Sequence, residues 1–392
     1  MFIRQLAAEL QDMMRCYPIV TIIGPRQSGK TTLVRSLYPA LPYVSLENPD
    51  ERRLAAIDPR AFLGRFPDGA IIDEVQRFPE LLSYLQGIVD ARNQNGLFIL
   101  TGSHQLALHE AIAQSLAGRT AILKLLPLNM AELSQNGVVY SVDDYLFQGM
   151  YPRIYQHQIP PAKFYRDYML TYLERDVRQM IQIKDLSLFQ QFLHLCAGYV
   201  GQLLNHDALS NAIGVTAATI KHWLSILEAS FIIFRLPPYY ENFGKRIIKS
   251  HKLYFYDVGL ASYLMDFRDK KELGYSPMRG HLFENFVILE LLKNRLHRGI
   301  EPSMYFYRDN NQREVDLILK SGTQLLPIEI KSSQTFTPSF LSGLQYFKNL
   351  ASSRCETGFL VYTGEQSQRI GDFQLIHFKQ LNAVFSIDEG HL

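Results

Sequence analysis

The stretch that decides the fold is Gly24-Pro25-Arg26-Gln27-Ser28-Gly29-Lys30-Thr31, which directly follows the apolar run Ile19–Ile23. Its glycines let the backbone turn tightly, so that amide hydrogens can face phosphate oxygens, while Lys30 neutralises charge and Thr31 can ligate magnesium. Residues Thr32–Leu37 have the pattern of a helix, whose N-terminus also favours an anion. Strand, loop and helix together predict a phosphate-binding loop. A glycine turn without a nucleotide is the less favoured alternative.

Two further apolar runs end in polar side chains that suit the same site. Ala70–Ile72 leads into Asp73 and Glu74, and Leu97–Leu100 leads into Thr101. Asp73 would hold Mg²⁺ through water, whereas Glu74 would orient or deprotonate the attacking water. Thr101 could touch the γ-phosphate or that water. The expected ATP contacts are Gly24, Pro25, Arg26, Gln27, Ser28, Gly29, Lys30, Thr31, Thr32 and Thr101.

Arg119, in the sequence Leu116-Ala117-Gly118-Arg119, is a candidate for a catalytic arginine. Such a residue stabilises the charge of the transition state, either in its own chain or in a neighbouring subunit. The simpler alternative is an arginine that forms a surface salt bridge.

Residues 15 to 135 resemble the AAA+-like ATPases. The resemblance rests on Gly24 to Leu33, on Ile72-Asp73-Glu74-Val75-Gln76 and on Leu100-Thr101-Gly102-Ser103. It implies a parallel α/β sheet of the ASCE type of P-loop NTPase, with an extra strand between the Ile19–Ile23 strand and the Asp73 strand. It also implies that Glu74 is the catalytic base of ATP hydrolysis.

The whole chain has the composition of an ordered, globular protein. It has 392 residues, of which 47% are hydrophobic and 20% charged, and this length suggests two or three domains. We expect an ATPase domain at 1–140, a helical connector with a winged helix at 141–268, and an α/β domain at 269–392. A net charge of +2 is too small to indicate nucleic-acid binding by itself. With no signal-peptide pattern and no membrane-spanning run, we expect a cytoplasmic protein.

A helix-turn-helix pattern occupies residues 208–224, with Gly214 at the turn. Two strand-like runs follow, Phe231–Leu236 and Lys252–Tyr256, which together predict a winged helix with a basic hairpin. Winged helices contact duplex DNA through such hairpins, although the same fold also serves as an ATPase lid or a protein-contact module. The expected DNA-binding residues are Lys245, Arg246, Lys249 and Lys252.

The last third of the chain carries carboxylates in a strand context. Asp316 lies in Glu314–Leu319, and Glu329 with Lys331 lies in Pro327–Lys331. The spacing predicts a hairpin with its turn at Ser321-Gly322, and the two-residue repeat puts Glu329 and Lys331 on one face.

This arrangement resembles the PD-(D/E)xK nucleases, which have a restriction-endonuclease-like fold. The resemblance implies that Asp316 and Glu329 bind Mg²⁺, that Lys331 orients or activates water, and that the helical Glu284 completes the site. The alternative is a nuclease-like fold kept for binding or assembly, in which these charges form a buried ion-pair network.

Residues from about 160 to the end also resemble the domain of undefined function that commonly follows this ATPase module. Thr171–Val177 and Tyr256–Leu260 carry that resemblance. The leading hypothesis is an ATPase whose nucleotide state repositions a C-terminal half that acts on duplex DNA. The alternative is a nucleotide-dependent switch that binds a protein partner through a chemically silent C-terminal half.

Overall fold

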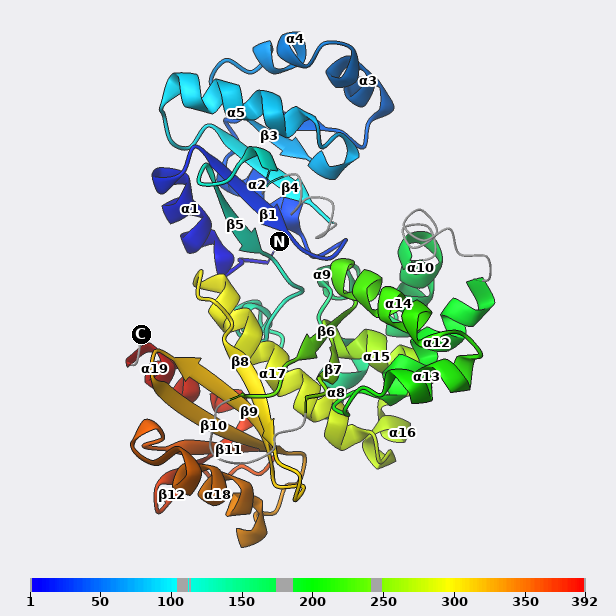
Figure 1. The fold of residues 1–392 in the computed structure, drawn as a ribbon, viewed down its shortest axis with the longest axis vertical. Coiled ribbons are helices and arrows are strands. Elements are labelled where there is room, and N and C mark those ends of the chain that lie inside the picture. Colours follow the sequence, from blue (N-terminus) through cyan, green and yellow to red (C-terminus); the bar gives the residue numbers. More distant parts are fainter. Residues whose placement is uncertain (1, 104–111, 113, 174–185, 241–248, 391–392) are drawn as a thin grey trace.

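The computed structural model describes residues 2–103, 112, 114–173, 186–240 and 249–390 (Figure 1). Along the chain it contains a five-stranded sheet, a helical body with a two-stranded sheet, and a six-stranded sheet. The long helix α17, Arg279–His297, contacts all three parts. It packs against α1 (Leu6–Cys16), β5 (Thr120–Lys124), α8 (Val142–Gln148) and β10 (Gln324–Lys331).

The first sheet has the strand order β2-β3-β4-β1-β5, and all its neighbouring strands are parallel. The strand β4 lies between β1 and β3, which confirms the expected extra strand between the phosphate-loop strand and the Asp73 strand. Because the strands are parallel, the loops that follow β1, β3 and β4 meet at one edge. The strands are β1 (Ile19–Ile23), β2 (Tyr43–Ser45), β3 (Ala70–Asp73), β4 (Phe98–Gly102) and β5 (Thr120–Lys124).

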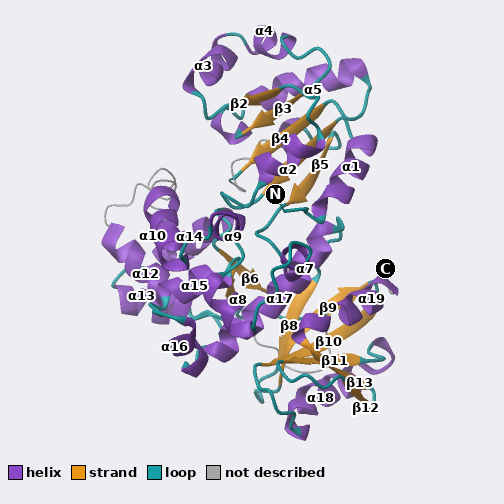
Figure 2. Cartoon of the chain, turned by 180° about the vertical axis from the view of Figure 1, so that it is seen from behind, coloured by secondary structure: helices purple, strands orange, loops and turns teal. Residues whose placement is uncertain are grey.

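Helices cover both faces of this sheet (Figure 2). Val20 and Ile22 pack into a core with residues of α1 and α2, whereas Ile19 and Ile23 point to the other face and pack with residues of α4 and α5. This alternation explains why every residue of β1 is buried, including Thr21, as is typical of a strand covered on both faces. The helices are α1 (Leu6–Cys16), α2 (Lys30–Leu37), α3 (Pro49–Ile57), α4 (Pro59–Gly64), α5 (Leu81–Arg92) and α7 (Met130–Ser134).

The middle of the chain is a helical body, as its sequence pattern predicted. A π-helical turn, Met169–Leu173, follows α10, and residues 174–177 of the Thr171–Val177 motif lie outside the described residues. The helices are α8 (Val142–Gln148), α9 (Pro152–His157), α10 (Pro161–Tyr168), α12 (Leu186–Gly198), α13 (His206–Ile213), α14 (Ala217–Ala229), α15 (Val258–Leu264) and α16 (Lys270–Tyr275).

The predicted helix-turn-helix is α13 followed by α14. Gly214 ends α13 with φ +79°, a conformation that glycine adopts without strain, and the Thr216 side chain caps α14. The strands β6 (Ile233–Leu236) and β7 (Lys252–Phe255) pair antiparallel. The predicted helices and strands are therefore present, while their assignment to a winged helix stays a prediction.

The C-terminal sheet is mixed, with the order β12-β13-β11-β10-β9-β8. The predicted hairpin is β9 paired antiparallel with β10, and Gly322 at its turn has φ +58°. The strand β11 pairs parallel with β10. The elements are β8 (Met304–Arg308), β9 (Glu314–Ser321), β10 (Gln324–Lys331), α18 (Ser342–Ala351), β11 (Gly358–Tyr362), β12 (Gln368–Ile370), β13 (Phe373–His377) and α19 (Asn382–Gly390).

Candidate functional site

The phosphate-binding loop has the backbone that its glycines predict. A Cβ atom at Gly24 would lie 2.1 Å from the carbonyl oxygen of Leu125, so only glycine fits there. Gly29 has φ +96° and directly precedes α2. The first backbone N–H groups of α2, which have no acceptor within the helix, therefore lie directly after the loop, where they can bind phosphate.

Lys30 is the buried cation of this loop. Its Nζ donates hydrogen bonds to the carbonyl oxygens of Gly24 (2.9 Å) and Pro25 (2.8 Å). Burial lowers the pKa of Lys30 to about 8, although the nearby Glu74 and Asp73 carboxylates oppose this shift. Phosphate oxygens close to Nζ would favour the charged ammonium over the neutral amine.

Asp73 and Thr31 lie where a magnesium ion would be bound in a site of this kind. The Thr31 hydroxyl donates to Asp73 Oδ1 (3.1 Å), and the Tyr43 hydroxyl donates to Asp73 Oδ2 (2.8 Å). Thr101, at the end of β4, also hydrogen bonds to Asp73. These groups offer hard oxygen ligands, which fit Mg²⁺. Tyr43 was not anticipated from the sequence.

Glu74 follows β3 in a left-handed conformation, with φ 58° and ψ 43°. This conformation is uncommon for a residue other than glycine, and such strain is concentrated at functional sites. Gln76 Nε2 donates to Glu74 Oε2 (2.5 Å), Ser103 Oγ donates to the same oxygen (3.3 Å), and Gln76 Nε2 also reaches Ser103 Oγ (3.0 Å). Gln76 is thus a positioning residue whose role sequence reasoning missed, although it lies only two residues after Glu74.

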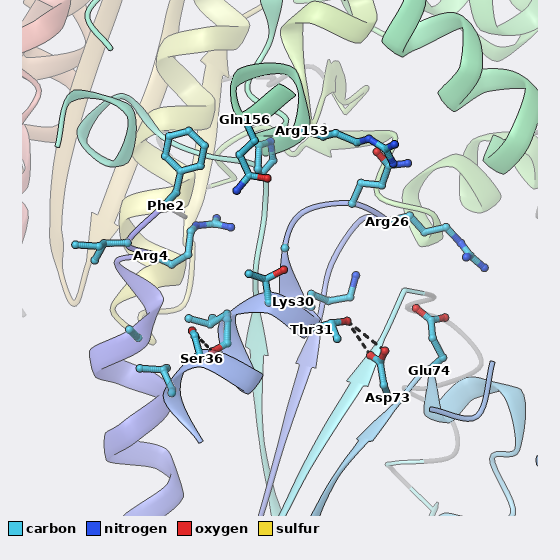
Figure 3. Close-up of a pocket in the computed structure, with 18 of the residues that line it drawn as sticks. Phe2, Arg4, Arg26, Lys30, Thr31, Ser36, Asp73, Glu74, Arg153 and Gln156 are labelled. Atoms are coloured by element: carbon cyan, nitrogen blue, oxygen red, sulfur yellow. Dashed lines mark hydrogen bonds between the residues drawn. The ribbon is translucent and has the colours of Figure 1, made fainter. Parts of the chain in front are cut away.

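Four of these residues line one cavity of about 580 Å³ (Figure 3). They are Lys30 and Thr31 of α2, Asp73 at the end of β3, and Glu74, which follows it. Arg153 and Gln156 of α9, in the helical body, line the same cavity, and Gln156 lies beside Phe2. The sequence held no signal for this second wall, because α9 is more than a hundred residues from the phosphate-binding loop.

Other residues expected at the nucleotide lie in or beside the loop. Arg26 lines the cavity and has Nη1 3.9 Å from Glu47 Oε2. Gln27 Oε1 and Ser28 Oγ are buried and have no hydrogen-bond partner among the described residues. Buried polar atoms are seldom left unpaired, so these two are consistent with a ligand-binding loop.

Arg119 does not belong to this cavity. It precedes β5 at the edge where β1 begins, because Ile19 pairs with Thr120, whereas the phosphate-binding loop follows Ile23 at the other edge. Five residues of strand separate the two edges by roughly 16 Å. Arg119 Nε lies 2.6 Å from Asp90 Oδ1, so the residue forms a surface salt bridge. A catalytic role for Arg119 within its own chain is therefore wrong.

The predicted DNA-binding residues do not form one exposed basic surface. Lys249 is exposed, but Lys252 is 2% exposed. Lys252 Nζ contacts Glu284 Oε1 (2.9 Å) and Glu314 Oε1 (2.5 Å). These two carboxylates draw the lysine inward, so its assignment as a phosphate contact is wrong. Lys245 and Arg246 lie outside the described residues.

Asp316, Glu329 and Lys331 meet on one face of the β9–β10 hairpin, as predicted. Lys331 Nζ lies 2.6 Å from Glu329 Oε1 and 3.5 Å from Asp316 Oδ2, and the Ile330 amide donates to Asp316 Oδ2 (2.8 Å). Glu329 Oε2 is buried without a partner among the described residues. Burial and the Asp316 charge raise the pKa of Glu329 to about 8, although Lys331 opposes them.

Glu284 is held by a different set of partners. Lys252 and the Tyr254 hydroxyl both hydrogen bond to Glu284 Oε1. Burial raises the pKa of Glu284 to about 7 against the opposing effect of Lys252. Among the described residues, no group of three or more His, Cys, Asp or Glu side chains is arranged to hold a metal ion. The metal set Glu284, Asp316 and Glu329 therefore stays a prediction, and the structure pairs its acids with lysines.

Three family matches divide the chain. Residues 17–134 match the family described as "AAA domain", residues 139–271 match a domain of unknown function (DUF8612), and residues 279–381 match another (DUF4143). The first match and the motifs around Lys30 and Asp73 make the N-terminal region an AAA+-like, ATP-binding region of the P-loop ATPase class.

Relatives from other organisms cover much of the chain. An uncharacterized protein of Mycobacterium tuberculosis is 29% identical over 392 residues, which cover 98% of this chain and 86% of the relative. An uncharacterized protein of Haemophilus influenzae is 25% identical over 277 residues, which cover 66% of this chain and 64% of that protein. Among solved structures, a Walker-type ATPase of Pyrococcus abyssi matches with a TM-score of 0.46 and 15% identity, over 67% of this chain and 96% of that chain. No helix in the described ranges is both long and apolar enough to cross a lipid bilayer.

Proposed function

We propose that the protein is a magnesium-dependent ATPase in which Glu74 activates the attacking water. The observation that carries this proposal is the shared cavity, which is lined by Lys30 and Thr31 after β1 and by Asp73 and Glu74 at the carboxyl end of β3. Phosphoryl transfer requires mainly positioning and charge stabilisation, and these four residues supply both.

Lys30 would bind the β- and γ-phosphates of ATP. Its Nζ would exchange the carbonyl oxygens of Gly24 and Pro25 for phosphate oxygens, which carry more negative charge. Thr31 and Asp73 would hold Mg²⁺, which, when bound, neutralises charge that develops on the phosphates.

Glu74 would accept the proton of the water that attacks the γ-phosphate. Gln76 and Ser103 both hydrogen bond to Glu74 Oε2, which fixes this carboxylate and leaves Oε1 for the water. Thr101 accepts a hydrogen bond from the Glu74 amide (3.3 Å) and so ties the base to the end of β4.

The experiment that tests this proposal is phosphate release from ATP by the purified full-length chain. We expect multiple turnovers with Mg²⁺ and loss of turnover when EDTA is added. A chain that binds MgATP yet releases no phosphate, either alone or with candidate partners, would refute the hydrolytic role of Glu74.

We further propose that the nucleotide state acts on the C-terminal half, and that this half binds or cleaves duplex DNA. The support is the gathering of Asp316, Glu329 and Lys331, together with the unpartnered Glu329 Oε2. Two neighbouring carboxylates supply the oxygen ligands that Mg²⁺ prefers. We expect Mg²⁺-dependent cleavage of linear duplex DNA that is lost in Asp316→Asn, while ATP turnover is kept.

One observation favours the alternative, a nucleotide-dependent switch that binds a protein partner. Lys331 already lies between Asp316 and Glu329, and Lys252 already neutralises Glu284. A carboxylate cluster that its own lysines satisfy can serve structure alone. Wild-type protein that neither binds nor cleaves DNA at low salt, with the ATPase intact, would select this alternative.

A further inference from the structure

The cavity around Lys30 adjoins a second, larger cavity. The second one has a volume of about 1110 Å³ and is formed largely by residues 136–161 of the helical body. Four residues line both cavities, namely Phe2, Thr32, Gln156 and His157. The two cavities therefore adjoin, with these four residues at the junction.

The direction of a bound triphosphate follows from the phosphate-binding loop. Asp73 and Glu74 mark the end where the γ-phosphate would react, and Lys30 reaches the β- and γ-phosphates. Thr32 is the third residue of α2, so its free amide lies one step beyond the Mg²⁺ ligand Thr31. The α-phosphate and the attached nucleoside would thus leave the loop past Thr32, toward the junction.

The junction has the chemistry that a nucleobase requires. The half-buried ring of Phe2 packs edge-on against Tyr155, with the ring centroids 6.4 Å apart and an interplanar angle of 85°. Tyr155 is fixed in turn, because its hydroxyl donates to the Gly149 carbonyl (2.5 Å). The Phe2 ring therefore packs against a hydrogen-bonded neighbour, and aromatic faces bind bases by stacking.

Polar groups also face this junction. Gln156 and His157, at the end of α9, are exposed, and neither has a hydrogen bond or ion pair within the part of the chain that the structure describes. Figure 3 shows Gln156 beside Phe2, above the loop that carries Lys30. An amide group has both a donor and an acceptor, so it can pair with the polar edge of a base.

We infer that the nucleoside of the bound nucleotide lies at this junction, with its base on Phe2 and its polar edge facing Gln156. This inference rests on the proposed ATP site and adds the residues that recognise the base. Residues 139–271, which include α9, lie outside the AAA domain match. The nucleotide would therefore join the ATPase region to the helical body, so that base recognition itself brings the two together.

The experiment separates the base from the phosphates by using two probes, MgATP and magnesium tripolyphosphate. Tripolyphosphate presents the same phosphate chain without a nucleoside. Binding of each probe to full-length protein is measured by calorimetry for wild type, Phe2→Ala and Gln156→Ala. Gln135→Ala is the matched control, because Gln135 is exposed at the end of α7 and lines neither cavity.

We expect Phe2→Ala to weaken MgATP binding by about tenfold, since stacking contributes about 1–3 kcal/mol per base. Gln156→Ala should weaken it by about threefold. Both variants should bind tripolyphosphate as wild type does. Three outcomes would each overturn the inference. The variants could lose equal affinity for the two probes, both variants could bind MgATP as wild type does, or wild type could bind both probes with the same affinity. Wild-type protein that binds neither probe would instead refute the ATP site itself.

Discussion

Arg4 Nη1 donates a hydrogen bond to the carbonyl oxygen of Ser28, at 2.6 Å, inside the phosphate-binding loop. The same guanidinium bonds to the Leu126 carbonyl (2.7 Å) and forms a salt bridge with Glu132 Oε1 (3.1 Å). All of these groups are buried. The loop that would hold the phosphates is therefore attached to the segment that leaves the first sheet after β5.

The segment that follows β5 is in turn hydrogen-bonded to α17. The Met130 amide donates to Glu290 Oε2 (2.8 Å), and Lys293 Nζ donates to the Leu128 carbonyl (2.7 Å). Glu290 and Lys293 lie in the C-terminal half of α17, and Glu284 of the carboxylate cluster lies about 1.7 turns before Glu290 on the same helix. A single helix thus contacts both the segment that holds the loop and the C-terminal acids.

The first prediction is that Glu132→Gln is strongly destabilising. Glu132 is fully buried, and although burial opposes its charge, Arg4, His297 and the Gln5 amide hold its pKa below the ordinary value. Removing one partner of a buried ion pair leaves the other uncompensated, which costs about 3–5 kcal/mol. Urea unfolding should show this loss.

The matched control is the double variant Arg4→Met with Glu132→Leu, which removes both charges. Replacing both partners of a buried pair by apolar residues removes the uncompensated charge, but here it also leaves the Ser28 and Leu126 carbonyls and the Gln5 and Asn129 amides without their side-chain partners. We therefore expect the double variant to be destabilised as well, and to bind ATP less tightly than wild type because Ser28 loses its tether. Equal stability of wild type and Glu132→Gln would contradict the anchoring role of the pair.

The second prediction concerns the pH dependence of ATP binding. Because burial lowers the pKa of Lys30 to about 8, the free protein loses this charge as the pH rises past that value. ATP binds the charged ammonium, so MgATP affinity should fall above pH 8, by up to about tenfold per pH unit. Calorimetric titration with MgATP between pH 6.5 and 9.5 measures this affinity.

Lys30→Ala supplies the control for that titration. The affinity of this variant for MgATP should be far weaker than that of wild type. It should not fall between pH 7.5 and 9.5, because the variant has no Lys30 ammonium to lose. A wild-type affinity that stays constant up to pH 9.5 would mean that the buried ammonium is not lowered in pKa, or that it does not bind phosphate.

The third prediction separates binding from chemistry at Glu74. Glu74→Gln keeps Lys30, Thr31 and Asp73, so MgATP should bind within about threefold of wild type, while turnover should fall by about 10²–10⁴-fold because the water loses its base. Gln76→Ala should lower turnover less, since it only releases the carboxylate of Glu74. Unchanged turnover in Glu74→Gln would assign the base to another residue.

The strands β1, β3 and β4 of the first sheet were predictable because local chemistry specifies them. The glycine loop, the apolar runs and the terminal carboxylates each have a recognisable pattern within a few residues, and the resemblance to AAA+-like ATPases implied that a strand lies between β1 and β3. Arg4 and Lys252 were not predictable in the same way. Arg4 meets Glu132 across 128 positions, and Lys252 meets Glu284 across 32. No local pattern distinguishes a lysine drawn into such a cluster from one exposed on a basic hairpin.

The last prediction concerns Glu329 and the pH dependence of stability. Burial and Asp316 raise the pKa of Glu329 from 4.5 to about 8 in the folded protein. The folded state thus keeps a proton that the unfolded state releases, so this stabilisation is complete below pH 4.5 and is lost as the pH rises through 8.

Glu329→Gln cannot ionise and avoids that loss. Relative to wild type, it should therefore gain stability steadily between pH 5 and pH 8, measured as the difference in urea midpoint converted to free energy. The exposed Glu356→Gln is the control, and its difference from wild type should not depend on pH. A difference for Glu329→Gln that is flat or that shrinks with rising pH would mean that Lys331 keeps Glu329 ionised, and would identify the cluster as a permanent ion pair.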